Sequence, residues 1–297
     1  MATSLVKGSI VALVTPFNAD GSVNYDKLGE LIDYHIANKT DGIVLLGTTG
    51  ESPTLTFEEE EKMLEYSVKR AAGRIYLIAG SGSNCTETAV ERTRAYSRTG
   101  VDAMLVITPY YNRSNASGMI KHFTACADAS EKPIIMYNVP GRTGCSISEE
   151  AVAVLCKHPN IQGIKEASGN ISYLCKIAKY LDEDFVLYSG NDDMIVPALS
   201  MGGIGVISVW ANIMPQTTHQ LVMDYLDGNT ESARKIQTRY LDLINDLFLE
   251  TNPIPVKAAM NYLGYEVGPC RMPLDEMSAG PKAKMIVEID RLKDELK

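Results

Sequence analysis

The sequence contains no run of about 18 apolar residues, the length needed to span a bilayer. Residues 1–8 also lack the basic stretch and apolar core of a signal peptide. Basic residues are in the minority, because 28 Lys plus Arg stand against 37 Asp plus Glu, for a formal net charge of −9. Nucleic acids and anionic membranes attract basic surfaces, so neither is expected as a partner. These absences predict a cytoplasmic protein.

Metal-binding and disulfide patterns are missing as well. The six cysteines include no C-x-x-C pair, and none of the four histidines is paired at the spacing of metal ligands. No predicted strand ends in a cluster of carboxylates, and the nucleophile motif G-x-S-x-G does not occur. We therefore expect neither a metal site nor serine hydrolase chemistry.

What the sequence does contain is a regular series of short apolar runs rich in Val and Ile. Each run is continuous rather than alternating, as in parallel strands buried on both faces, and amphipathic helical segments separate the runs. Eight such strand and helix units predict a TIM (β/α)8 barrel. A doubly wound open sheet is the alternative, although its G-x-G-x-x-G fingerprint is absent. The eight runs span residues 10–14, 42–46, 75–79, 103–107, 133–137, 161–165, 185–189 and 205–209.

After the eighth run the strand pattern stops and only helical patterns follow. We expect helices over residues 231–249, 256–263 and 281–296. Asn252, Pro253 and Pro255 separate the first two helices, because proline cannot continue a helix. The predicted organisation is a barrel over residues 1–225 with a helical domain over residues 226–297.

The most informative strand end is that of the sixth run, where Lys165 follows apolar neighbours. In TIM barrels the active site lies at the carboxyl ends of the strands. Burial favours a neutral amine, and a neutral amine attacks carbonyl carbons to form a Schiff base. The alternative is a structural Lys165 neutralised by Glu166 or another carboxylate.

Two further strand ends, those of the second and fifth runs, carry polar candidates. A phenol such as Tyr137 can move protons around an imine, or it can be a core tyrosine with a satisfied hydroxyl. Thr48 and Thr49 lie in a glycine-flanked turn suited to a carboxylate, or they stabilise only the turn itself. Arg142 follows a Pro-Gly pair and can hold a carboxylate with two hydrogen bonds, or it is a solvated surface arginine.

Three motifs occur in a fixed order at these strand ends: G-T-T-G-E at 47–51, Y-N-V-P-G-R-T-G at 137–144 and G-I-K-E-A at 163–167. Together they closely resemble the dihydrodipicolinate synthase family of class I aldolase-like barrels. The resemblance spans nearly the whole chain, since T-P-F at 15–17, T-P-Y-Y at 108–111, G-V-I-S-V at 205–209 and N-P-I-P-V-K at 252–257 also match.

The resemblance implies a reaction and an assembly. Pyruvate would condense with L-aspartate 4-semialdehyde to give 4-hydroxy-tetrahydrodipicolinate, the first committed step toward diaminopimelate and lysine. An enamine needs only a desolvated amine and a proton shuttle, so no metal or organic cofactor is expected. The family also suggests a homotetramer built from two tight dimers.

The resemblance further assigns a role to each of eight residues. These are the imine-forming Lys165; the proton relay of Tyr137, Thr48 and Tyr111, the last from a neighbouring subunit; Thr49 for the pyruvate carboxylate; Arg142 for the semialdehyde carboxylate; and Gly190 and Ile207, which would line the site through their backbone carbonyls.

Other functions stay open at this point. N-acetylneuraminate lyases share the lysine and the tyrosine, but Arg142 and Thr49 favour the synthase. A phosphate- or flavin-binding barrel would need a glycine-rich loop opening a helix, whereas Asn191-Asp192-Asp193 is acidic. A non-catalytic binding protein on the same barrel is the third possibility, since fold does not fix function.

Regulation by lysine is where the sequence departs from the family. Members inhibited by lysine carry histidines shortly after the G-T-T-G-E turn and a glutamate on the next helix. The matching positions here are Phe57, Glu60 and Thr88. A bound α-amino group would lose its acidic partner, so we expect weak or absent inhibition by lysine.

Overall fold

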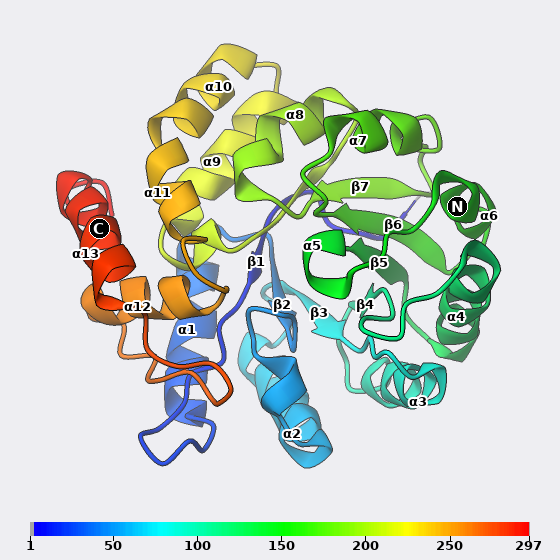
Figure 1. Ribbon diagram of the computed structural model, residues 1–297, viewed down its shortest axis with the longest axis horizontal. Helices are drawn as coiled ribbons and strands as arrows, with labels where there is room; N and C mark the ends of the chain where they lie inside the picture. The colour runs from blue at the N-terminus through cyan, green and yellow to red at the C-terminus, as the bar shows by residue number, and fades with distance from the viewer. Residues whose placement is uncertain (1–2, 297) are drawn as a thin grey trace.

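Eight parallel strands pair in chain order and close on themselves, with β8 against β1, in the computed structural model of residues 3–296 (Figure 1). The predicted TIM barrel is therefore confirmed, and the open sheet is wrong. The strands are β1 (Gly8–Ala12), β2 (Gly42–Leu45), β3 (Tyr76–Gly80), β4 (Ala103–Ile107), β5 (Ile134–Asn138), β6 (Ile161–Glu166), β7 (Val186–Ser189) and β8 (Gly205–Ser208).

Helices follow each strand and surround the barrel (Figure 1). None of the helices in residues 3–296 is long and apolar enough to cross a membrane. The main helices are α1 (Tyr25–Ala37), α2 (Phe57–Ala71), α3 (Thr86–Tyr96), α4 (Ala116–Ala129), α6 (Glu149–Leu155), α7 (Ile171–Ala178), α8 (Ile195–Ser200) and α9 (Pro215–Leu226). Four short turns of helix lie at strand ends: η1 (Ser52–Thr54), α5 (Pro140–Thr143), η2 (Asp192–Met194) and η3 (Trp210–Asn212).

The first strand lies two residues earlier than the sequence predicts. Residues 13 and 14 are apolar and buried, which is why the pattern includes them. However, the backbone N–H of Val14 donates to Asn212 Oδ1 (3.2 Å), so a side chain takes the place of a strand partner. The strand therefore ends at Ala12, and the chain turns toward the barrel mouth.

Side chains alternate between two apolar layers along each strand, as the pleat requires. One layer fills the barrel and includes Ile78, Ile135 and Ile207. The other packs between the strands and the surrounding helices and includes Ile43, Met136 and Ile164. Because both faces are covered, the strands have the continuous apolar runs seen in the sequence.

Four helices form the C-terminal appendage: α10 (Thr230–Arg239), α11 (Leu241–Asp246), α12 (Ile254–Tyr262) and α13 (Ala279–Arg291). They pack against one side of the barrel, where α10 lies next to α8 and α9, and α11 contacts η2 and α13 (Figure 1). The single helix expected over residues 231–249 is wrong. The helix breaks at Tyr240, whose ring packs 5.4 Å from that of Trp210 and whose hydroxyl donates to Glu295 Oε2 (2.6 Å).

Candidate active site

Tyr137 and Lys165 lie side by side at the carboxyl ends of β5 and β6, where the strand ladder pairs the two residues. Both side chains face the inside of the barrel, because they alternate with outward-facing Met136 and Ile164. The Lys165 Nζ lies 4.2 Å from the centre of the Tyr137 ring. The register of two strands thus brings an amine and a phenol together at the barrel mouth.

The Lys165 side chain is buried but has no acidic partner at contact distance. Lys165 is 6% exposed, and no carboxylate within residues 3–296 lies within 4.0 Å of its Nζ. Glu166 points away, because its two oxygens accept from Asn138 Nδ2 and the Ser168 N–H (both 2.7 Å). Burial raises the pKa of Glu166 above its ordinary value. The ion pair of Lys165 with Glu166, considered above as an alternative, is not formed.

Asp192 is a buried carboxylate that the sequence did not single out as part of a site. Its Oδ2 accepts from the backbone N–H groups of Val209 and Trp210 (both 2.9 Å), which connects the end of β7 to the end of β8. Burial raises the pKa of Asp192, while its hydrogen bonds and the positive charge of Lys165 act in the opposite direction. Asp192 therefore belongs to the electrostatic surroundings of the lysine without contacting it.

Gly190 gives the Lys165 side chain its room. A Cβ at residue 190 would lie 3.0 Å from Lys165 Cε and 2.6 Å from Ala167 Cβ. The Gly190 N–H donates to the Glu166 carbonyl (2.7 Å), which fixes the backbone against β6. Ile207 is 1% exposed and lies in the barrel interior with Tyr137. Gly190 therefore lies beside the amine and Ile207 in the same barrel interior, and the roles expected for their backbone carbonyls stay predictions.

The β2–α2 turn carries Thr48 and Thr49 in a fixed conformation. Leu46 and Glu51, at its two ends, have φ angles of +57° and +55°, in the left-handed region that few side chains adopt. The Glu51 N–H donates to the Thr48 carbonyl (3.1 Å). Thr49 is 2% exposed, and its Oγ1 accepts a hydrogen bond from Asn252 Nδ2 (2.9 Å).

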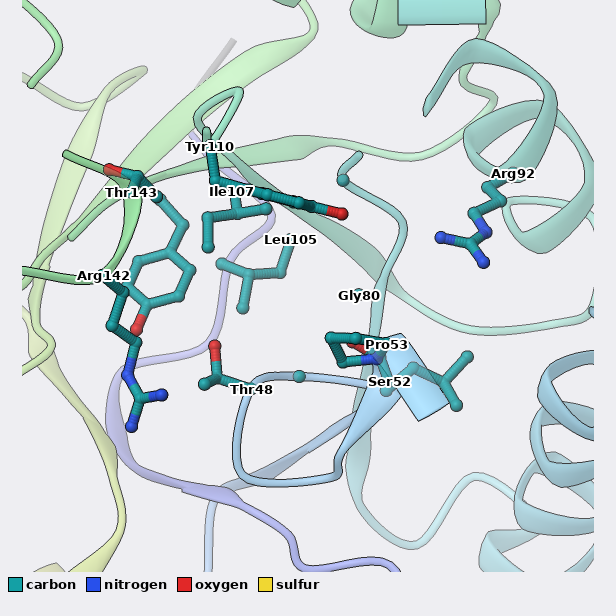
Figure 2. A pocket seen from close by; sticks show the side chains of 14 residues that line it. Thr48, Ser52, Pro53, Gly80, Arg92, Leu105, Ile107, Tyr110, Arg142 and Thr143 are labelled. Carbon is teal, nitrogen blue, oxygen red and sulfur yellow. The ribbon is translucent and has the colours of Figure 1, made fainter. Parts of the chain in front are cut away.

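Arg142 lies in the short helix α5, immediately after β5. One nitrogen of its guanidinium, Nη2, donates to the backbone carbonyl of Asn252 (2.8 Å). The side chain lines the same cavity as Thr48, and Figure 2 shows both on one side with Arg92 at the other. Arg142 therefore lies at the barrel mouth, as the sequence analysis predicted, although residues 140–143 form a turn of helix and not an irregular loop.

A cavity of about 220 Å³ opens among these residues and is large enough for a small organic acid. Thr48, Tyr137 and Arg142 are among the polar residues that line it, and Leu105 and Ile107 are among the apolar ones. Three of the eight predicted site residues, Thr48, Tyr137 and Arg142, therefore line this cavity, and Lys165 lies beside Tyr137.

Tyr111, another predicted site residue, lies on the surface of this chain and not among the residues that line the cavity. It is 90% exposed and has a φ angle of +69°, so the loop after β4 presents the ring to the outside. The loop places Tyr111 away from Tyr137 and Thr48, with which the sequence analysis grouped it.

The sequence analysis missed the ion pair that connects the appendage to the β2–α2 turn. Lys257 Nζ lies 2.8 Å from Glu51 Oε1 and donates to the carbonyls of Thr15 (3.0 Å) and Pro269 (2.5 Å). Both charged side chains are at most 2% exposed. Burial lowers the pKa of Lys257, and Glu51 opposes that shift.

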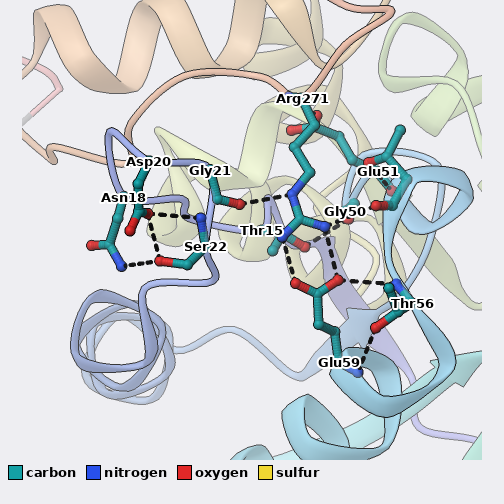
Figure 3. A network of polar contacts seen from close by, with 11 residues as sticks. Thr15, Asn18, Asp20, Gly21, Ser22, Gly50, Glu51, Thr56, Glu59 and Arg271 are labelled. Carbon is teal, nitrogen blue, oxygen red and sulfur yellow. Dashed lines mark hydrogen bonds and ion pairs between the residues drawn. The ribbon is translucent and has the colours of Figure 1, made fainter.

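Arg271 adds a second connection from the appendage to the same region (Figure 3). Its backbone N–H donates to Glu51 Oε2 (2.8 Å), and its guanidinium contacts both oxygens of Glu59 (2.5 and 2.8 Å). Thr15 Oγ1 also donates to the Gly50 carbonyl of the turn (2.6 Å). No local pattern signals the contacts of Lys257 and Arg271 with Glu51 and Glu59, because these partners lie 206 to 220 residues apart in the chain.

Comparison with known proteins places this site in a family. The model of the Dihydrodipicolinate synthetase family matches residues 5–291. The 4-hydroxy-tetrahydrodipicolinate synthase of Thermoanaerobacter sp. (strain X514) is 51% identical over 273 residues, 92% of each chain. The structure of dihydrodipicolinate synthase from Aquifex aeolicus matches with a TM-score of 0.94 and 44% identity, over 98% of this chain and 99% of that one.

A chloride-inhibited dihydrodipicolinate synthase from Acinetobacter baumannii, solved in complex with pyruvate, also matches. Its TM-score is 0.94 and its identity 37%, over 96% of this chain and 98% of that one. These matches agree with the resemblance found in the strand-end motifs. The chain therefore belongs to the dihydrodipicolinate synthetase family.

Proposed function

We propose that this protein condenses pyruvate with L-aspartate 4-semialdehyde to give 4-hydroxy-tetrahydrodipicolinate, through an imine on Lys165. The observation that carries the proposal is a buried lysine that forms no ion pair within residues 3–296 and lies 4.2 Å from the centre of a tyrosine ring at the barrel mouth. No carboxylate among residues 3–296 contacts the Lys165 Nζ, so a carbonyl carbon in the barrel mouth can approach this nitrogen as a nucleophile. Membership of the family supports the choice of substrates.

The chemistry follows from the amine. Lys165 Nζ attacks the keto carbon of pyruvate, and loss of water from the carbinolamine gives the imine. Removal of a methyl proton then gives an enamine, whose carbon attacks the aldehyde of the semialdehyde. The amino group of that substrate finally attacks the imine carbon, which closes the ring and releases Lys165. Tyr137, Thr48 and Tyr111 would carry the protons between these steps.

The two substrate carboxylates need separate partners. Thr49 and the backbone of its turn would hold the carboxylate of pyruvate, close to Lys165. Arg142, at the rim, would hold that of the semialdehyde with the nitrogens not bonded to Asn252. The backbone carbonyls of Gly190 and Ile207 would complete the wall of the substrate site.

In this proposal residues 1–225 form the catalytic domain and residues 226–297 form the helical domain. The protein acts in the cytoplasm.

Borohydride trapping tests the proposed function directly. Reduction in the presence of pyruvate fixes an imine that otherwise reverses, and intact mass with peptide mapping locates it. An adduct confined to Lys165 supports the mechanism, whereas a folded sample without adduct contradicts it.

Rates with aspartate semialdehyde, N-acetylmannosamine and glyceraldehyde then identify the acceptor. Equal rates with all three would contradict the role given to Arg142.

We further propose that the protein is a homotetramer of two tight dimers in which Tyr111 enters the partner's site. Its 90% exposure in the single chain supports this arrangement. Tyr111→Phe is expected to lower kcat by about 100-fold, the lower end for loss of a proton-transfer group. Tyr262→Phe, a change to another exposed tyrosine, should leave kcat unchanged. Sedimentation should show at least a dimer, and a fully active monomer would contradict the shared site.

Lysine in the millimolar range is expected to change turnover by less than about twofold, below the fivefold or more of typical allosteric coupling. The Glu60 carboxylate is 1% exposed and already engaged, because Tyr96 OH donates to its Oε2 (2.5 Å) and Arg92 Nη2 lies 3.1 Å away. Phe57 stacks on Tyr96 and offers no charge to an α-amino group. Initial rates at rising lysine concentration check this, and clear inhibition would contradict it.

A further inference from the structure

Asn252 connects the appendage to the two residues proposed to hold the two substrate carboxylates. It lies between α11 and α12 and is 4% exposed. Its side-chain Nδ2 donates to Thr49 Oγ1 (2.9 Å), and its backbone carbonyl accepts from Arg142 Nη2 (2.8 Å). Thr49 comes from the β2–α2 turn and Arg142 from α5, so a single residue contacts both subsites.

The direction of the hydrogen bond to Thr49 has a chemical consequence. A hydroxyl has one proton to donate and lone pairs that accept. Because Asn252 Nδ2 can only donate, Thr49 Oγ1 is the acceptor in this contact. Within residues 3–296 the Thr49 hydroxyl has no other hydrogen-bond partner. The Thr49 hydroxyl can therefore still donate its proton in a hydrogen bond. A carboxylate is a suitable partner, because it only accepts hydrogen bonds.

We infer that Asn252 is a positioning residue that orients the Thr49 hydroxyl proton toward the pyruvate carboxylate. The inference rests on the proposed function, because it takes Thr49 as a partner of that carboxylate. The backbone carbonyl of Asn252 fixes Arg142 at the same time. The side chain of Asn252 thus acts on the pyruvate subsite, and its backbone on the semialdehyde subsite.

Other contacts hold the turn, so its conformation does not depend on the Asn252 amide. Lys257 and Arg271 bind Glu51, and Thr15 binds the Gly50 carbonyl. The amide also carries a buried oxygen, Oδ1, that has no hydrogen-bond partner among the described residues. Replacing Asn252 with leucine, which has nearly the same shape, removes this unpaired oxygen together with the donor. The fold is therefore expected to tolerate the change.

The experiment measures the pyruvate concentration that gives half-maximal borohydride trapping in wild-type protein, Asn252→Leu, Thr49→Val and the double variant. Asn252→Leu should raise this concentration about tenfold. The double variant should match Thr49→Val within about twofold, because both changes remove the same hydroxyl contact. The KM for aspartate semialdehyde should change less than about threefold, since the backbone carbonyl that holds Arg142 remains.

Two further variants separate positioning from general support of the structure. Asn261→Leu removes an amide in the same appendage that donates to the Gly268 carbonyl (2.9 Å), and it should trap pyruvate as the wild type does. Asn252→Asp keeps the size of the side chain, but its carboxylate can only accept hydrogen bonds. The Thr49 hydroxyl would then donate to this carboxylate instead of to pyruvate, so the variant should weaken pyruvate binding at least as much as Asn252→Leu. It also provides the test if Asn252→Leu fails to fold.

Each outcome has one meaning. Wild-type half-saturation in Asn252→Leu or in Asn252→Asp overturns the inference and leaves the proposed function standing. If the fold-changes of the two single variants multiply in the double variant, the inference is also overturned, because Asn252 would then act independently of Thr49. Absence of trapping in the wild-type protein contradicts the proposed function, and the inference falls with it.

Discussion

Replacing Lys165 with methionine is expected to abolish pyruvate trapping and to lower kcat/KM by at least about 10⁴-fold, as removal of a covalent nucleophile does. Methionine is similar in length and apolar, so it can occupy the space between Gly190 and the Tyr137 ring. No contacting carboxylate loses its partner, since Glu166 is bound to Asn138 and Ser168. Loss of activity should therefore come without loss of fold.

The measurements are steady-state rates, intact mass after borohydride treatment, and thermal unfolding. The midpoint temperature should stay within a few degrees of wild type, because the unfolding free energy changes by less than about 1 kcal/mol. Lys235→Met is the matched control, since Lys235 is an exposed lysine paired with Glu231 on the surface. More than 1% residual turnover, judged against the 10⁴-fold loss expected for a lost nucleophile, would show that Lys165 is not the nucleophile.

Replacing Lys257 with methionine is expected to destabilise the protein by about 3–5 kcal/mol, because it leaves the Glu51 carboxylate buried without its counter-ion. The midpoint of thermal unfolding should fall by about 10 °C. Glu51 would retain only the Arg271 N–H at 2.8 Å as a close donor among the contacts described above. Calorimetry or circular dichroism measures the shift.

The double variant Glu51→Gln, Lys257→Met gives the control for this explanation. With both charges removed, much of the lost stability should return, because the cost comes from an unpaired buried charge. Lys235→Met, which breaks a surface pair, should cost less than about 1 kcal/mol. A Lys257→Met protein within 1 kcal/mol of wild type would mean that water or another group stabilises Glu51.

The strands could be predicted because their signal is local. Residues buried on both faces give a continuous apolar run, and the polar residue that follows marks the barrel mouth, as at Lys165 and Tyr137. The errors arose where a distant group decided the local structure. Val14 leaves its strand because Asn212 binds its N–H, and the helix over residues 231–249 breaks where Tyr240 packs on Trp210.

The residues of the candidate site also differ in whether a local sequence signal could predict them. Lys165 and Thr48 follow from strand-end position and chemistry, whereas Tyr111 was assigned only by resemblance. Asn252 was interpreted as a helix break, because its contact with Thr49 joins residues 203 positions apart. The pair of Glu51 and Lys257 escaped prediction for the same reason, since a lone lysine in a helix usually faces solvent.

The connections from the appendage to the β2–α2 turn also determine when the site can form during synthesis. All eight strands have left the ribosome before Asn252, Lys257 and Arg271 are made, because β8 ends at Ser208. Until then Glu51 has no counter-ion and the Thr49 hydroxyl has no amide beside it. Thr49 and Arg142 of a nascent chain therefore lack their contacts with Asn252 until this point of synthesis. A chain that ends before residue 252 would therefore present the Thr49 hydroxyl without its amide donor, and we expect it to bind pyruvate more weakly than the full chain.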